Sequence, residues 1–396
     1  MNDATTADGA HPPVAHLAAL TSLRFFAAFA VLMFHYVRDL SDGRVGNALA
    51  SVGYTGVTFF FVLSGFILAH NYKDVDFKQR TTVLRFYAAR LSRVYPVLLV
   101  TLLLSVPFAI AQWLKMPPGT LKTLAASSAL LAPLGLHAWV PGAACAINCP
   151  SWSISTEFFF YLLFPLMVLP IMRRPRLSLL VTLGAWALAC GACLWLWEAF
   201  GDGSSIMFPH EATARELSAQ AIKYFPIGRL PEFALGIVLY ALWFTLPRQS
   251  TALLLAGFFL AGAAIVRFAP ALPEIVLHNG LTAVAWAPLI LAAAGMRGGP
   301  LCAAPLVYLG RISFALYLVH FPVMTFVKAV DKRLPESVLS LHPGLAIAAV
   351  TALAIGAAAL VHHLVEEPSR KPMMRRLAGL WRLSEPDNRK RRGIDG

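Results

Sequence analysis

The chain has 396 residues, of which 58% are hydrophobic and only 13% are charged. Soluble domains carry roughly 45–50% apolar and about 25% charged residues, so this composition excludes a soluble globular domain and indicates a protein that crosses a membrane many times. The net charge of +13 at pH 7 is gathered at the ends of apolar segments and in a basic tail. That distribution is typical of a membrane protein, and nucleic acid is not expected as a partner.

Residues 1–16 are polar and contain no Lys or Arg, so we expect a disordered lead and not a signal peptide. After them come ten apolar segments long enough to span a bilayer, which takes about 17–25 residues. We therefore expect an all-α polytopic membrane protein, a bundle of about ten transmembrane helices. The segments are 17–36, 53–71, 94–114, 153–172, 177–197, 223–245, 252–269, 279–296, 306–327 and 343–364.

The positive residues orient this bundle. Loop 72–93 carries six Lys or Arg residues, loop 173–176 carries three, and the tail after Glu367 carries nine. Cytoplasmic loops are enriched in positive residues, and ten spans bring both ends of the chain to one side. We therefore expect both termini in the cytoplasm and a multi-pass protein of the plasma membrane, the inner membrane in a Gram-negative bacterium. The tail also favours contact with anionic membrane lipid.

Two features of the outer side stay open at this stage. Residues 121–140 are apolar enough to span, but a span there would place the arginine-rich loop 173–176 outside, so an interfacial or re-entrant helix is favoured. Cys145 and Cys149 follow in the same loop. They form a disulfide only if a turn brings them together in an oxidising compartment, and free thiols are equally compatible with the sequence.

The first span carries two polar residues, Arg24 and His35. An eleven-residue separation returns to within about 20° of the same helix face and corresponds to about 16 Å along the axis. A charge within a membrane span costs several kcal/mol, so it normally faces a protein interior or water and has a function. The alternative is that Arg24 reaches an interface and His35 lies at a helix end, but the shared face favours a functional pair.

Other polar residues interrupt later spans. Glu157 lies about five residues into the fourth span, at a depth similar to that of His35, and is the expected partner of His35 or Arg24. Arg229 and Glu232 are three residues apart on one face of the sixth span. They form either a structural ion pair or a supporting part of the site. His320 in the ninth span is either a core histidine or a supporting residue. His362, His363 and Glu366 lie near the cytoplasmic end of the tenth span.

The stretch RFYAARLSRVYP at residues 85–96 places Arg85, Arg90 and Arg93 at the cytoplasmic start of the third span. One interpretation is an ordinary positively charged flank. The other is a phosphate clamp, because Arg90 and Arg93 share a helix face and a guanidinium group binds phosphate oxygens through a fixed pair of donors.

At these residues the sequence resembles the acyltransferase-3 family of membrane O-acyltransferases. The resemblance runs from residue 17 to residue 368, and its motifs are specific as an ordered set. They are Arg24 and His35 in an R-x10-H pattern, GVTFFFVLSGFIL (56–68), RFYAARLSRVYP (85–96), WSISTEFFFYLLFP (152–165), GRLPEF (228–233) and ISFALYLVHFPV (312–323). The division that follows is a lead at 1–16, an acyltransferase-3 membrane domain at 17–368 and a basic cytoplasmic tail at 369–396.

The resemblance implies transfer of an acyl group, commonly acetyl, from cytoplasmic acetyl-coenzyme A to a hydroxyl of a surface or lipid-linked carbohydrate at the outer side. It implies roles in activity for His35 and Arg24, and in donor binding for Arg90 and Arg93. No metal is expected. Larger members add an outer SGNH hydrolase-like domain, and we expect none in this chain. A separate outer-side partner or a homo-oligomer is compatible with the sequence.

The residue types fit this chemistry. A neutral imidazole at His35 can take the proton of an attacking alcohol, and Glu157 can orient it as the third group does in catalytic triads. Arg24 can bind donor phosphate or a developing oxyanion, and the sequence does not separate these roles. The rival function is a proton-coupled transporter, which also places acids and bases inside a bundle. The two halves of the chain show no evident repeat, which counts against it.

Overall fold

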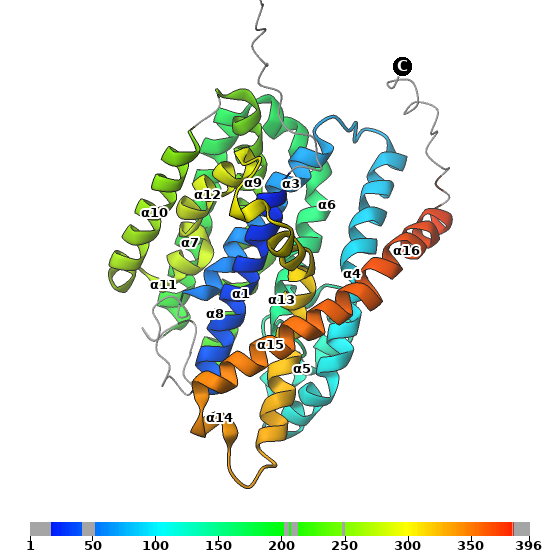
Figure 1. The fold of residues 1–396 in the computed structure, drawn as a ribbon, viewed down its shortest axis with the longest axis vertical. Helices are drawn as coiled ribbons and strands as arrows, with labels where there is room; N and C mark the ends of the chain where they lie inside the picture. The colour runs from blue at the N-terminus through cyan, green and yellow to red at the C-terminus, as the bar shows by residue number, and fades with distance from the viewer. Residues whose placement is uncertain are drawn as a thin grey trace, which may run out of the picture.

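In the computed structural model, residues 17–41, 52–201, 206, 213–247, 250–381 and 383 are described, and every regular element among them is helical. Ten helices or helical runs are long and apolar enough to cross a membrane. The predicted all-α membrane bundle is therefore confirmed (Figure 1). The long helices are α1 (Ala18–Ser41), α3 (Gly56–Tyr72), α4 (Arg80–Lys115), α6 (Trp152–Arg173), α7 (Pro175–Phe200), α9 (Pro226–Thr245), α10 (Thr251–Phe268), α12 (Ala283–Gly295), α13 (Ala304–Asp331) and α15 (Pro343–Val361).

Shorter elements connect these helices. The α-helical ones are α5 (Thr120–Leu131), α8 (Thr213–Tyr224), α11 (Glu274–Val276), α14 (Val338–Leu341) and α16 (Glu367–Leu380). Two π-helical segments, η6 (Leu277–Leu281) and η8 (His362–Glu366), lie at helix junctions. The 3-10 turns are η2 (Gly53–Thr55), η3 (His137–Trp139), η4 (Cys149–Ser151), η5 (Ala269–Ala271) and η7 (Pro300–Cys302).

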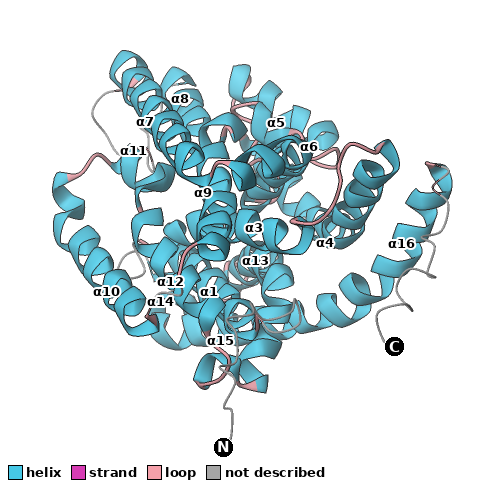
Figure 2. Cartoon of the chain, turned by 90° about the horizontal axis from the view of Figure 1, so that it is seen from above, coloured by secondary structure: helices cyan, strands magenta, loops and turns pink. Residues whose placement is uncertain are grey.

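The centre of the bundle is formed by α3, with α9, α13 and α1 close by, whereas α10 and α16 lie at the periphery (Figure 2). Helix α10 has no buried residue. Helices α3 and α9 cross at glycines: a Cβ atom at Gly65 would meet the carbonyl oxygen of Phe233 at 2.1 Å, and one at Gly236 would meet that of Val62 at 1.9 Å. Small residues permit such close backbone approach between membrane helices.

Helix α4 is longer than the predicted span 94–114. It begins at Arg80 and continues to Lys115, which at about 1.5 Å per residue is roughly 54 Å. The arginine motif therefore lies inside a helix that packs against α6 and α13, and not in a loop flanking the span. Hydropathy alone placed the start of the helix too late, because the first turns of α4 carry polar residues.

The predicted interfacial segment 121–140 contains α5, whose 12 residues extend about 18 Å and are too short to span a bilayer. Cys145 and Cys149 form a disulfide in the loop that follows, which answers the question that the sequence left open. His137 is buried, and its Nε2 lies 2.9 Å from Ser151 Oγ. Burial lowers the pKa of His137 to about 4, so this imidazole is neutral near pH 7.

The end of the chain differs from the predicted division. Helix α15 passes through the π-helical turn η8 into α16, so residues 369–380 of the predicted tail are helical. Residues 1–16 and 384–396 lie outside the described residues. Tyr308 at the start of α13 contacts His363 in η8, directly after α15, and Val307 and Leu17 line one cavity. The starts of α1 and α13 and the end of α15 therefore share one end of the bundle.

Candidate active site

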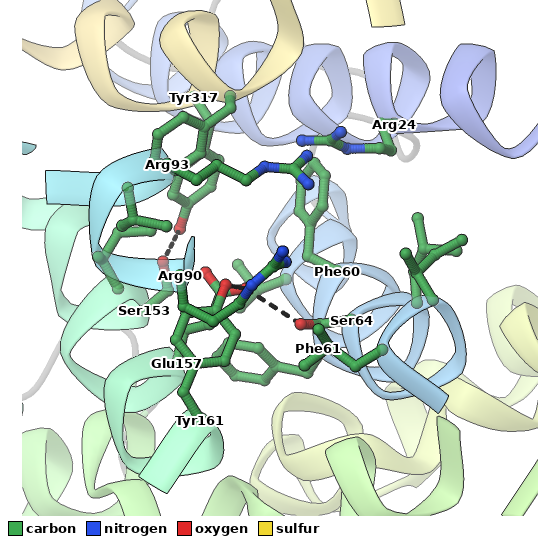
Figure 3. Close-up of a pocket in the computed structure, with 17 residues that line it drawn as sticks. Arg24, Phe60, Phe61, Ser64, Arg90, Arg93, Ser153, Glu157, Tyr161 and Tyr317 are labelled. Atoms are coloured by element: carbon green, nitrogen blue, oxygen red, sulfur yellow. Dashed lines mark hydrogen bonds between the residues drawn. The ribbon is translucent and has the colours of Figure 1, made fainter. Parts of the chain in front are cut away.

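A cavity of about 850 Å³ lies among α1, α3, α4, α6 and α13. Its walls are mainly aliphatic and aromatic, with a small number of polar groups directed into the space (Figure 3). This combination is typical of a ligand site. The lining residues are Arg24, Val57, Phe60, Phe61, Leu63, Ser64, Ile67, Leu68, Arg90, Arg93, Val94, Ser153, Ile154, Glu157, Tyr161, Phe314 and Tyr317.

Three arginines give the cavity its charge. The guanidinium groups of Arg24, Arg90 and Arg93 converge on the same space from α1 and α4 (Figure 3). Arg90 donates to Tyr72 OH at 3.4 Å, whereas its Nε has no hydrogen-bond partner. Within the described residues, Arg24 and Arg93 form no hydrogen bond or ion pair. Three cations face one lining carboxylate, that of Glu157, so the cavity is suited to an anionic ligand.

Glu157 lines this cavity, but the predicted contact between Glu157 and His35 is wrong. Glu157 Oε1 accepts hydrogen bonds from Ser64 Oγ at 3.0 Å and from Tyr161 OH at 2.5 Å. Tyr161 follows Glu157 by one helical turn, and Ser64 comes from α3. The carboxylate is therefore fixed among the arginines at the cavity wall and does not orient the imidazole.

The partner of His35 is His320. His35 Nδ1 lies 3.0 Å from Val31 O and 3.2 Å from His320 Nε2, and the ring centroids are 5.1 Å apart. His320 Nδ1 lies 3.3 Å from Leu316 O. If each Nδ1 carries the proton and donates to the carbonyl of its own helix, then His320 Nε2 accepts from His35 Nδ1–H. In that arrangement His35 Nε2 carries a free lone pair.

The position of His320 is fixed from two sides. Its side chain is fully buried, and its backbone carbonyl accepts a hydrogen bond from Tyr36 OH at 2.9 Å. Tyr36 is the neighbour of His35 on α1, so the same segment of α1 holds both halves of the histidine pair. The sequence indicates the two histidines as separate candidates, and the fold brings them together.

Tyr317 connects the cavity with this histidine pair. It lines the cavity, and it precedes His320 by one turn of α13, with ring centroids 6.1 Å apart. Ser153 Oγ donates to Tyr317 OH at 2.9 Å, and Tyr317 OH lies 3.2 Å from Pro150 O. The histidine pair is therefore about one helical turn beyond the cavity wall that Tyr317 and Ser153 form.

A second cavity, of about 700 Å³, continues the first toward the end of the bundle where α1 begins. Four residues line both cavities: Arg24, Leu63, Ile67 and Arg93. The second cavity extends to Leu17 and Val307. The two cavities adjoin at these residues, and their linings together extend from that end of the bundle to Tyr317.

Two predicted groups lie outside these two cavities. Arg229 and Glu232 form a fully buried ion pair at 3.1 Å, and Arg229 also donates to His278 O at 2.5 Å and to Asn279 Oδ1 at 2.7 Å in η6. These bonds hold the π-helical turn against α9, so the structural interpretation of the pair is favoured. Arg85 is half-buried on α4 and is not among the residues lining either cavity.

Several site residues were missed from sequence: Ser64, Tyr72, Tyr161 and Tyr317. Hydroxyl groups are common in membrane helices and carry no charge, so no pattern separated them from packing residues. Two weak signals existed. Ser64 is the hydroxyl at the centre of an apolar run in α3, and Tyr161 follows Glu157 at the spacing that places side chains on one helix face.

These features define a multi-pass membrane protein that encloses a positively charged cavity next to a histidine pair. A family model described as an acyltransferase domain, acyltransferase-3, matches residues 17–363. The chain therefore belongs to the acyltransferase-3 family and is an acyltransferase.

Its curated relatives agree with this assignment. The chain is 31% identical to the acyltransferase MdmB of Streptomyces mycarofaciens, over 92% of this chain and 94% of that one. It is 22% identical to the O-acetyltransferase OatA of Staphylococcus aureus, over 79% of this chain and 51% of the relative. It is 25% identical to the peptidoglycan O-acetyltransferase OatA of Listeria monocytogenes, over 78% of this chain and 50% of the relative. The chain thus spans about half the length of the OatA proteins. No solved structure matches it.

Proposed function

We propose that this acyltransferase moves an acyl group, in particular acetyl, from a cytoplasmic acyl-coenzyme A to a hydroxyl of a surface or lipid-linked carbohydrate at the outer side of the inner membrane. The observation that carries the proposal is the cavity in which Arg24, Arg90 and Arg93 converge. Coenzyme A presents phosphate groups, and arginine binds phosphate oxygens through paired donors. A transporter, the rival function, does not by itself account for this cluster or for the family.

The direction of donor access follows from the two joined cavities. The second cavity reaches the end of the bundle where α1 begins, and the distribution of Lys and Arg favours the cytoplasm for that end. A donor that enters there meets Arg24 and Arg93 first. Its acyl-bearing arm then extends along the apolar walls toward Tyr317. The aliphatic and aromatic lining, including Phe60 and Ile154, suits an uncharged arm and excludes water.

The proposed reaction uses His35 as general base. His35 Nε2 removes the proton of the acceptor hydroxyl while the hydroxyl oxygen attacks the thioester carbonyl carbon. The carbon–sulfur bond then breaks, the leaving sulfur takes the proton from His35, and the products are the acyl ester and the free thiol of coenzyme A. His320 holds His35 in the tautomer with a free Nε2. Arg24 supplies fixed positive charge to the donor phosphates or the developing oxyanion.

A carbohydrate acceptor is supported by the relatives, because one of them is described as a peptidoglycan O-acetyltransferase. The histidine pair lies toward the end of the bundle where α1 finishes, opposite the proposed donor opening. An acceptor at that side would meet the acyl group without crossing the membrane. The outer loop with the disulfide borders the same region, since Asn148 donates to Leu318 O at 3.0 Å.

The test uses purified full-length protein in lipid nanodiscs with labelled acetyl-coenzyme A and muropeptide fragments as acceptor. The expected result is acceptor-dependent release of free coenzyme A thiol together with label on the acceptor, and neither from the His35→Ala protein. Release of thiol without labelled product would show hydrolysis only. A protein that binds acetyl-coenzyme A with no turnover on any carbohydrate offered would overturn the acceptor class, and absence of donor binding would overturn the donor.

A further inference from the structure

The junction between α15 and α16 gathers two histidines and two glutamates in consecutive turns. His362 and Glu366 belong to the π-helical segment η8, and their side chains are 8% and 6% exposed. His363 and Glu367 are about half exposed. A π-helical turn inserts an extra residue into the helix and recurs at functional sites. Here it directs ligand-bearing atoms of His362, His363 and Glu367 to positions within 4.8 Å of one another.

The contacts of His362 define its proton position. His362 Nδ1 lies 2.8 Å from Glu366 Oε2, so Nδ1–H donates to that buried carboxylate. His362 Nε2 then presents a lone pair, and it faces Glu367 Oε1 at 3.3 Å. A lone pair opposite a carboxylate oxygen is repulsive unless a cation lies between them. A carboxylate bound to the far nitrogen of a histidine is also the usual outer partner of a metal-binding imidazole.

His363 repeats this arrangement. Its Nε2 lies 3.1 Å from Tyr308 OH, so Nε2–H can donate to the phenol oxygen. Its Nδ1 faces Glu367 Oε2 at 3.3 Å. Two imidazole nitrogens and both oxygens of one carboxylate therefore converge. In a tetrahedral zinc site with bonds of about 2.0–2.1 Å, neighbouring ligand atoms are roughly 3.3–3.5 Å apart. Each imidazole nitrogen lies 3.3 Å from one of the two Glu367 oxygens, which is the separation that such a site requires between a nitrogen and an oxygen ligand.

We propose that His362, His363 and Glu367 bind a divalent transition metal, with zinc the best fit to two imidazoles and one carboxylate. Glu366 and Tyr308 hold the two imidazoles from behind. The metal lies where the sequence leads us to expect none, and it is separate from the histidine pair of the reaction. It joins α15, α16 and the start of α13, at the same end of the bundle as the second cavity, and its role there is structural.

Protons are the alternative occupants, because two doubly protonated histidines would satisfy the same contacts. The following experiment distinguishes a bound metal from bound protons. The full chain, carrying an affinity tag without histidine, is purified in detergent, stripped with a chelator and titrated with Co²⁺, which gives visible d–d absorption in such sites. We expect one Co²⁺ per chain, displaced by Zn²⁺. His363→Ala and Glu367→Gln should lose the absorption, and Glu366→Gln should bind about 10–100-fold more weakly.

His342→Ala is the matched control, because His342 is an exposed histidine at the other end of α15. It should bind Co²⁺ like the unmodified protein. His363 and Glu367 are exposed enough for substitution without loss of the fold, which gel filtration verifies. If the unmodified protein binds no more Co²⁺ than the double variant His363→Ala, Glu367→Gln, the imidazoles carry protons and the proposal is wrong. The binding readout does not depend on the proposed reaction.

Discussion

At the scale of single residues, the proposed mechanism rests on the contact between His35 and His320. Both His35 and His320 have an Nδ1 within hydrogen-bonding distance of a carbonyl on their own helix. With a proton on each Nδ1, His320 Nε2 is the acceptor in the contact between the rings, and His35 Nε2 has a lone pair for substrate. His35 is partly exposed and His320 is buried, so His35 is the one that we propose as the base for an acceptor hydroxyl.

We expect His35→Ala to lower acceptor acylation by about 10²–10⁴-fold, the usual contribution of a general base. Asn or Gln at this position should not restore activity, because neither takes a proton near pH 7. His320→Gln should retain more activity than His35→Gln, since it removes an orienting group and not the base. Mass spectrometry of the acceptor from cells with equal protein levels measures all of these. Acylation by His35→Ala at the unmodified level would rule out the mechanism.

The arginines of α4 give a second prediction at this scale. Arg90→Ala and Arg93→Ala together should raise the KM for acetyl-coenzyme A far more than the KM for the acceptor, because both side chains line the cavity. Lysine at both positions should restore donor affinity only in part, since the paired donors are lost.

Arg85→Ala is the control for this double variant. Arg85 lies on the same helix as Arg90 and Arg93 but does not line either cavity. It should leave the KM for the donor unchanged. An equal effect of all three arginines on membrane insertion, with no change in KM, would instead support a purely topological role for the motif.

At the scale of helices, the α3–α9 crossing positions the site. α3 contributes Ser64 and Phe60 to the cavity wall, and its distance from α9 depends on Gly65 and Gly236. A methyl group at either glycine would meet a backbone carbonyl that cannot move without shifting a helix. Any separation of α3 from α9 would displace Ser64, and with it the hydrogen bond to Glu157.

We therefore expect Gly236→Ala to destabilise the protein by about 1–3 kcal/mol, the usual cost of overpacking, and to lower its thermal unfolding temperature in detergent. Gly228→Ala is the matched control, because Gly228 is in the same helix and a Cβ there has no atom within 4 Å. Differential scanning fluorimetry compares the two. Equal unfolding temperatures would mean that the crossing tolerates a wider spacing.

The helices also show which parts of the structure the sequence could predict. Span number and approximate bounds follow from length and hydropathy, because the bilayer sets both. The start of α4 could not be predicted from hydropathy, since a helix continues through polar residues once it packs on its neighbours. The partner of His35 was predicted wrongly for a related reason. Depth along a span is readable from residue number, but the rotation of α6 and α13 about their axes depends on tertiary packing, and that rotation selects His320 over Glu157.

At the scale of the whole molecule, the two adjoining cavities make the two ends of the bundle different. Their linings extend from Leu17 and Val307, near the start of α1, to Tyr317, and the histidine pair lies beyond. In the proposed reaction, a donor and an acceptor would approach from opposite ends and would not compete for one opening. This arrangement serves transfer across a membrane only if the end where α1 begins faces the cytoplasm.

That orientation gives the last prediction. Single reactive cysteines are placed at two exposed positions, Glu336→Cys in the turn after α13 and Arg375→Cys in α16. The background keeps the Cys145–Cys149 disulfide and replaces the free cysteines Cys190, Cys193 and Cys302 by serine. The positive-inside distribution predicts that Glu336 faces outward and Arg375 faces the cytoplasm. In intact spheroplasts a membrane-impermeant maleimide should label the cysteine at 336 and not the one at 375, and permeabilisation should allow both to react. Labelling at 375 alone before permeabilisation would show that the bundle has the opposite orientation. The proposed donor would then have to enter from outside.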